Sequence, residues 1–331
     1  MGNSSSKQSA LMHVLYNLSP AICAAIVIAT AIWLKTYLDI GDVDLTDLKI
    51  NPIPDSGVLR SKQLAAQIAW TTSLFAYFLA FIVIMHTSIS IMLHSLHKKE
   101  PLKNVIIFCF VIILSIIACF TFKFERVSIG LVIDMMNEYL DYNINLLILA
   151  DRCGTIAIVF VIAAASLILS SKRELKESQT FHKSEQGKDL MRLLYVASLF
   201  LVAGIFEIKM CMDYLIIHIL PDDNYDRMKL LINNLDKQNF EQLSLSYKFL
   251  KEVADSTRTM SGAVYTALLA AMYLPAGLII DARLKQLGKD SVEGGTDSPM
   301  PPAVTRILNL VAGLAPFVMG TSLDILGKIK L

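Results

Sequence analysis

Long stretches of apolar residues without charged side chains alternate with short charged segments along this chain. A helix rises about 1.5 Å per residue, so about 20 apolar residues cross the roughly 30 Å of hydrocarbon in a bilayer. Stretches of this kind predict six transmembrane helices, at about 15–34, 65–86, 104–122, 153–171, 193–215 and 259–280. The predicted fold class is therefore all-α, a polytopic helical membrane protein.

The six predicted helices pair into three hairpins, each leaving and returning to the same side of the membrane. The hairpins cover residues 11–97, 98–175 and 190–284. Apolar residues recur at helical spacing in the segments between paired spans, which predicts extracytoplasmic helical segments, including an external helical cap at 216–257. Each hairpin is expected to bury one face against its neighbours.

The two ends of the chain are more polar than the hairpins. Residues 1–10 predict a cytoplasmic polar tail, and residues 285–303, rich in Gly, Ser, Asp and Pro, predict a linker. Residues 304–331 have an apolar stripe that favours an amphipathic helix at the membrane surface. A seventh crossing within 307–323 is the alternative.

The composition agrees with a membrane protein. Of the 331 residues, 54% are hydrophobic and 18% are charged, with a formal net charge of +1. Ordinary soluble domains have roughly 45–50% and 25%. These values exclude a disordered chain, a nucleic-acid-binding protein and an ordinary soluble enzyme.

Charge between the predicted spans sets the orientation. Basic residues exceed acidic ones in 94–103 and 172–192, while acidic residues exceed basic ones in 35–62, 123–152 and 207–258. Because basic short loops stay in the cytoplasm, we expect a multi-pass protein of the cell membrane with a cytoplasmic N-terminus. Trp33 and Trp70 then lie near the outer end of their spans, where tryptophan is enriched at the lipid interface.

Glu207 is the principal candidate for function, because it falls within the fifth apolar stretch. Charged residues inside a membrane are costly and mark ion pathways. One interpretation is a ring of Glu207 carboxylates lining an aqueous path in an oligomer. In the other, the span ends near Phe206, and Glu207 and Lys209 lie at the interface.

Polar and helix-breaking residues in the second and sixth spans each allow two interpretations. On the second span, polar residues at Ser73, Tyr77 and Thr87 predict either a pore lining or a hydrogen-bonding contact between helices. On the sixth span, a helix break at Pro275 and Gly277 predicts a gating hinge or an ordinary kink. On that same span, small residues every four positions predict a helix-packing face, formed by Ala263, Ala267 and Ala271.

No catalytic, cofactor-binding or metal-binding motif occurs in the sequence, so we expect neither an enzyme nor a cofactor or metal. The favoured function is a homo-oligomeric channel passing small ions, or a regulated membrane-permeabilising effector, for instance in defence, held shut by a cytoplasmic regulatory protein. The alternatives are a carrier with a midplane site and a non-catalytic scaffold or anchor that uses its external helical segment. The expected partners are the lipid bilayer and further copies of the chain, without nucleic acid.

Overall fold

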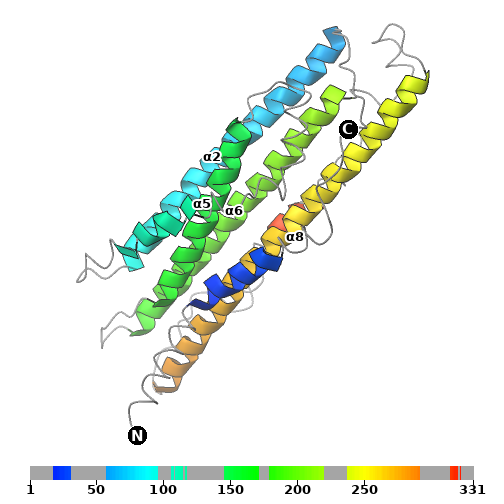
Figure 1. Cartoon of the computed structure of the whole chain (residues 1–331). Helices are drawn as coiled ribbons and strands as arrows, with labels where there is room; N and C mark the ends of the chain where they lie inside the picture. Colours follow the sequence, from blue (N-terminus) through cyan, green and yellow to red (C-terminus); the bar gives the residue numbers. More distant parts are fainter. Residues whose placement is uncertain are drawn as a thin grey trace.

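The computed structural model describes ten segments of the chain, all of them helical, at residues 18–30, 57–95, 106–107, 109–114, 116–117, 145–170, 179–219, 237–290, 314–319 and 321. Four long helices dominate it: α2 (Gly57–Ser95), α5 (Asn145–Ser170), α6 (Gln179–Ile219) and α8 (Lys237–Asp290). They lie side by side in an elongated bundle (Figure 1). The all-α prediction is confirmed for this part of the chain, which contains no β-strand.

Each long helix contains a segment long and apolar enough to cross a membrane, namely Ser61–Ser95, Leu146–Leu169, Gln186–Ile217 and Lys251–Ile280. These match the predicted second, fourth, fifth and sixth spans. The first predicted span contains a shorter apolar helix, Leu18–Thr30. The described residues of 104–122 are helical as well.

The outer surface of the bundle is itself apolar. Large side chains such as Phe75, Leu274 and Leu278 are each about two-thirds exposed, at 65%, 65% and 69%. Water-soluble proteins seldom expose many such residues together, whereas lipid solvates them. The apolar helices therefore indicate a multi-pass membrane protein.

Local sequence explains where the helices run. Within lipid, every backbone group must be bonded inside its own helix, so long apolar stretches fold as continuous helices. α6 runs from Gln179 to Ile219 without interruption. α8 continues through Pro275. It also takes in residues 237–257 of the predicted cap and 285–290 of the predicted linker, so these positions extend the sixth span as helix.

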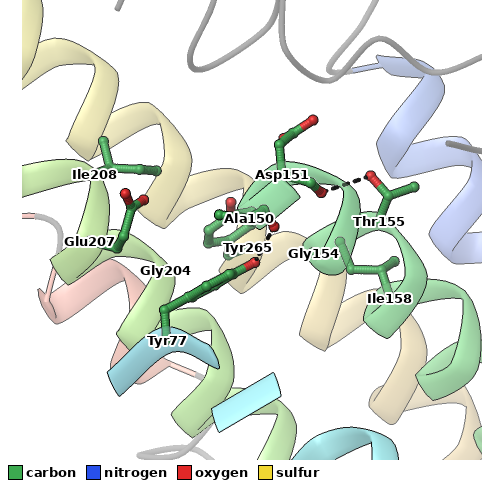
Figure 2. A pocket seen from close by; sticks show the side chains of 10 residues that line it. All are labelled: Tyr77, Ala150, Asp151, Gly154, Thr155, Ile158, Gly204, Glu207, Ile208 and Tyr265. Carbon is green, nitrogen blue, oxygen red and sulfur yellow. Dashed lines mark hydrogen bonds between the residues drawn. The ribbon is translucent and has the colours of Figure 1, made fainter. Parts of the chain in front are cut away.

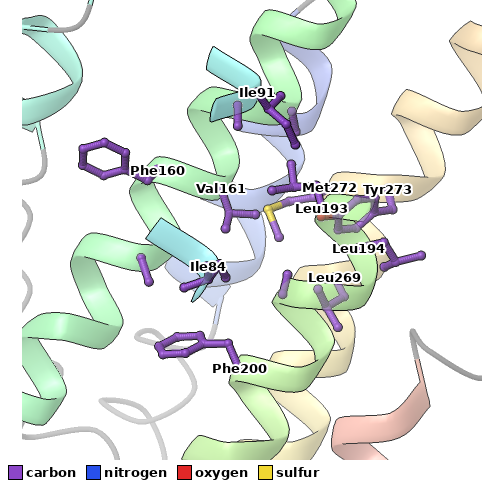
Figure 3. Close-up of a cluster of buried hydrophobic side chains, with 14 of the residues drawn as sticks. Ile84, Ile91, Phe160, Val161, Leu193, Leu194, Phe200, Leu269, Met272 and Tyr273 are labelled. Atoms are coloured by element: carbon purple, nitrogen blue, oxygen red, sulfur yellow. The ribbon is translucent and has the colours of Figure 1, made fainter. Parts of the chain in front are cut away.

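Two buried clusters hold the bundle together. The small cluster contains Trp70, Leu147, Cys211, Met212, Tyr214, Leu215 and Ala254. The large cluster fills the rest of the interior; Figure 3 labels its members Ile84, Ile91, Phe160, Val161, Leu193, Leu194, Phe200, Leu269, Met272 and Tyr273. Residue numbers rise from the small to the large cluster along α2, α5 and α8, but fall along α6. α6 is therefore antiparallel to the other three helices.

A seven-residue repeat forms the contact between α2 and α6, which is the most extensive helix pair in the bundle. Buried residues recur every seven positions on both helices: Trp70, Tyr77, Ile84 and Ile91 on α2, and Leu193, Phe200, Glu207 and Tyr214 on α6. A seven-residue repeat keeps one face of each helix toward its partner, as in a coiled coil. We call this the α2–α6 seam, and Glu207 is its one acidic member.

Candidate functional site

A small pocket, lined by both polar and apolar residues, lies among the four long helices. Its volume is about 40 Å³, and Figure 2 shows the side chains that line it: Tyr77, Ala150, Asp151, Gly154, Thr155, Ile158, Gly204, Glu207, Ile208 and Tyr265. Glu207 lies in the candidate span Gln186–Ile217, and the pocket residues Tyr77 and Tyr265 lie in the candidate spans of α2 and α8. The pocket is therefore inside the spans.

Glu207 faces the protein interior. Its side chain is only 3% exposed, and one carboxylate oxygen, Oε1, accepts a hydrogen bond of 3.2 Å from Nε1 of Trp70. α6 continues unbroken past Phe206 to Ile219, so Glu207 lies on a continuous helix. Within the described chain, Glu207 is enclosed by a single protomer.

Trp70 was expected near the outer end of its span with its ring at the lipid interface, but protein, not lipid, surrounds the ring. The indole is 2% exposed and stacks on Tyr214 of α6, with ring centroids 5.3 Å apart and planes 22° apart. The buried N–H needs an acceptor, and the Glu207 carboxylate provides one. Hydropathy places a tryptophan near the end of a span, but it does not say whether lipid or protein surrounds the ring.

Tyr77 fits between two helices because each presents a glycine. Its hydroxyl donates a 3.1 Å hydrogen bond to the backbone oxygen of Ala150, and its ring lies 5.0 Å from that of Phe200. A Cβ at Gly154 would lie 2.8 Å from the Tyr77 hydroxyl oxygen, and one at Gly204 would lie 3.4 Å from ring carbon Cε2. Glycine at these positions permits the close approach of α5 and α6 to the ring.

Three further pocket residues were not among the predicted site residues. Thr155 donates from Oγ1 to the backbone oxygen of Asp151 at 3.3 Å. Asp151 is half-buried, so it lies nearer the surface of the bundle than Glu207. Tyr265 brings a phenol from α8. Asp151 lies just before the predicted fourth span at 153–171, whereas α5 already begins at Asn145.

The pocket carries acidic but no basic chemistry. Among its ten described lining residues, Asp151 and Glu207 are acidic and none is Lys, Arg or His. The nearest basic residue along α6, Lys209, pairs with Asp213 at 2.8 Å on the half-exposed side of the helix, as the four-residue spacing predicts. A buried carboxylate without a cationic side chain favours a bound cation or water.

The other predicted polar residues lie away from the pocket. Ser73 is buried, and its hydroxyl donates to the backbone oxygen of Trp70 at 2.7 Å, so it bonds within its own helix. Thr87 is 3% exposed and lies further along α2, beyond Ile84. Pro275 lies inside α8, and Gly277 has no atom within 4 Å of its Cβ position. The hinge remains a prediction.

The predicted small-residue face of α8 does not lie against the described helices. Ala263 and Ala267 are exposed, and Ala271 is half-buried. α8 instead packs through an adjacent face that includes Leu268, Leu269, Met272 and Ala276. The small-residue face is thus directed outward from the bundle.

The C-terminal segment reaches the middle of α8. The backbone N–H of Phe317 donates a 3.0 Å hydrogen bond to Oγ1 of Thr266, close to the midpoint of the Lys251–Ile280 segment. The neighbouring side chains of Leu314 and Val318 are exposed. This part of the predicted 304–331 helix therefore lies beside the candidate span of α8.

Comparison with protein-family models, with curated proteins and with solved structures gives no match for this chain. Function must therefore be argued from the pocket itself.

Proposed function

We propose that this protein moves a small cation across the membrane through a site inside each protomer, with Glu207 as the binding group. One observation carries the proposal: the Glu207 carboxylate is buried within the spans, in a pocket whose described lining contains no basic side chain. A cation that visits the pocket would supply the missing positive charge. The carrier interpretation of the sequence is thus preferred to the oligomeric pore.

The position of Glu207 supports this preference. A ring of carboxylates around an oligomer axis needs Glu207 on the outer surface of each protomer. The side chain instead lies in the α2–α6 seam, with Trp70 bonded to it from the facing helix. Rotation of α6 toward an outer axis would break that bond and expose the carboxylate to lipid.

The size of the pocket limits the substrate. Sites for organic ligands usually measure about 300–1,000 Å³, whereas this pocket measures about 40 Å³. About 10–15 Å³ accommodates one water molecule. The pocket therefore suits an ion or a few waters, which also favours transport over catalysis on an organic substrate.

The proposed topology has six crossings in three hairpins, with the N-terminus in the cytoplasm of a cell-membrane protein. The directions of the four long helices are those that six crossings require, since α6 opposes the other three. In a chain without its native cysteines, single cysteines at Ser56 and Asn224 should react with an impermeant reagent on intact cells. Cysteines at Ser178 and Ser291 should not, and reaction at Ser178 would overturn the orientation.

Homo-oligomers remain part of the proposal, with each protomer holding its own site. The outward face at Ala263 and Ala267 suits close contact with a helix of another protomer, because small residues let helices approach. Ala267→Leu should then reduce the oligomer in detergent without unfolding the protomer. An unchanged oligomer size would remove this face from the interface.

Ion flux into vesicles tests the function. Purified protein in liposomes should move a small cation down an imposed gradient, and Glu207→Gln should slow that flux by about tenfold or more, since one lost charge interaction raises the barrier by that factor. Gln keeps an acceptor for Trp70, so the fold should remain. Lys209→Gln is the matched control, two residues away on the half-exposed side. Equal flux through wild type and Glu207→Gln would contradict the proposal.

A further inference from the structure

Two buried hydroxyl groups at the large cluster, one on a member and one on a residue between two members, Ile84 and Ile91, have no hydrogen-bond partner among the described residues. They are Oγ of Ser88 on α2 and Oη of Tyr273 on α8. Ser88 is 0% exposed and Tyr273 is 8% exposed. A buried polar group without a partner is unfavourable, and native structures keep few of them. Their presence beside the apolar side chains of the large cluster calls for a role.

The two hydroxyls lie on the opposite side of the pocket from the small cluster. Ser88 follows Tyr77 of the pocket by eleven residues, about 16 Å along α2. Tyr273 follows Tyr265 of the pocket by eight residues, about 12 Å along α8. The pocket and the two hydroxyls together place polar groups along the bundle, from Glu207 toward the end at which α6 begins.

The pocket offers a proton more than it offers a metal ion. Trp70 already directs an N–H group at Oε1 of Glu207, and a metal ion at that oxygen would face the positive end of the N–H dipole. Hard cations such as Ca²⁺ and Mg²⁺ take six or more oxygen ligands. Among the described residues, no three His, Cys, Asp or Glu side chains lie close enough together to hold a metal ion. A proton needs only the second carboxylate oxygen, Oε2.

Resting on the function proposed above, we propose that the transported cation is a proton, held on Glu207, and that it crosses the large cluster by way of the Tyr273 and Ser88 hydroxyls. A hydronium ion in the pocket gives its proton to Oε2 and leaves as water. The carboxyl group then returns the proton to a water molecule that enters the large cluster. The two hydroxyls supply hydrogen bonds to that water, and they gain the partners that they lack.

This role differs from a structural one in a measurable way. A hydroxyl that stabilises the fold loses a hydrogen bond when it is removed, so stability falls. Ser88 and Tyr273 have none to lose among the described residues. Ser88→Ala and Tyr273→Phe should therefore leave the thermal midpoint unchanged or raise it, while each slows proton flux roughly tenfold, the effect of one missing hydrogen bond on a barrier.

Matched controls are available in the same bundle. Ser166 of α5 has a satisfied hydroxyl, which donates to the backbone oxygen of Ile162 at 2.9 Å. Tyr195 of α6 is 39% exposed on the surface. Ser166→Ala and Tyr195→Phe make the same chemical changes away from the proposed path, so proton flux through both should equal that of wild type.

The experiment uses the full chain in liposomes that contain either a pH-sensitive or a sodium-sensitive dye. A membrane potential that is negative inside the liposomes is applied to drive cation uptake. We expect internal acidification by wild type, no sodium signal, and slow acidification by Ser88→Ala and Tyr273→Phe. Sodium uptake without acidification would overturn the proton assignment while the proposed function stands. Full acidification rates in both variants would overturn the path. No flux of either ion through wild type would overturn the proposed function itself.

Discussion

Two levels of the α2–α6 seam are equally buried and differ in chemistry. At one level, Ile84 and Leu193 are 1% and 0% exposed and carry only hydrocarbon side chains; two repeats away, Trp70 and Glu207 are 2% and 3% exposed and share a hydrogen bond. Packing accounts for the first level, since apolar side chains gain dispersion contacts there. It does not account for a carboxylate at the second. This contrast supports our proposal that the first level stabilises the bundle and the second serves its function.

The largest expected change in stability is at the apolar level. Leu193→Ala removes three carbons from a fully buried side chain and should lower the free energy of unfolding by about 2–5 kcal/mol. Glu207→Gln keeps the volume and the acceptor for Trp70, so it should cost less than about 1.5 kcal/mol. Denaturant unfolding in detergent measures both. Equal losses would mean that Glu207 is as structural as Leu193.

A smaller loss is expected where Tyr77 crosses between helices. Gly154→Ala places a methyl group 2.8 Å from the Tyr77 hydroxyl oxygen and should cost about 1–3 kcal/mol, as overpacking does. Tyr77→Phe removes that oxygen, so the double variant should recover most of the loss. Gly187→Ala, with no atom within 4 Å, is the control and should be neutral or stabilising by up to about 1 kcal/mol. Additive effects of the two pocket variants would contradict the contact.

The sequence predicts the helices better than it predicts the pocket. Apolar length and charge depend on residues close together in the chain, and they locate the segments that became α2, α5, α6 and α8. The bond between Trp70 and Glu207 joins residues 137 positions apart, and neither hydropathy nor local spacing indicates such a partner. The sequence identified Tyr77 as a candidate residue. It did not predict that Tyr77 packs against Gly154 and Gly204, because that contact depends on which helices become neighbours.

One sequence signal for the site was present. Leu193, Phe200, Glu207 and Tyr214 recur every seven residues, and this spacing puts Glu207 on the same helix face as three apolar residues. That pattern favours a buried Glu207 facing another helix, rather than one at the interface. The position of the C-terminal segment, set by a bond from Phe317 to Thr266, has no comparable signal.

The smallest effect is expected on the half-exposed side of α6. The Lys209 and Asp213 side chains, 19% and 45% exposed, form an ion pair of a kind that usually contributes about 0.3–0.5 kcal/mol. Lys209→Gln should therefore change thermal stability by little more than the error of the measurement and leave flux unchanged. A large loss of flux would extend the functional region beyond the pocket.

The most direct test of a site inside each protomer is a mixing experiment. Wild type and Glu207→Gln are combined in detergent at several ratios, reconstituted together, and assayed for cation flux. If each protomer contains its own pocket, flux should fall in proportion to the wild-type fraction. If carboxylates from several protomers form one ring, a single Gln impairs the whole assembly, and flux should fall much more steeply than the wild-type fraction. A steep fall would contradict the internal site.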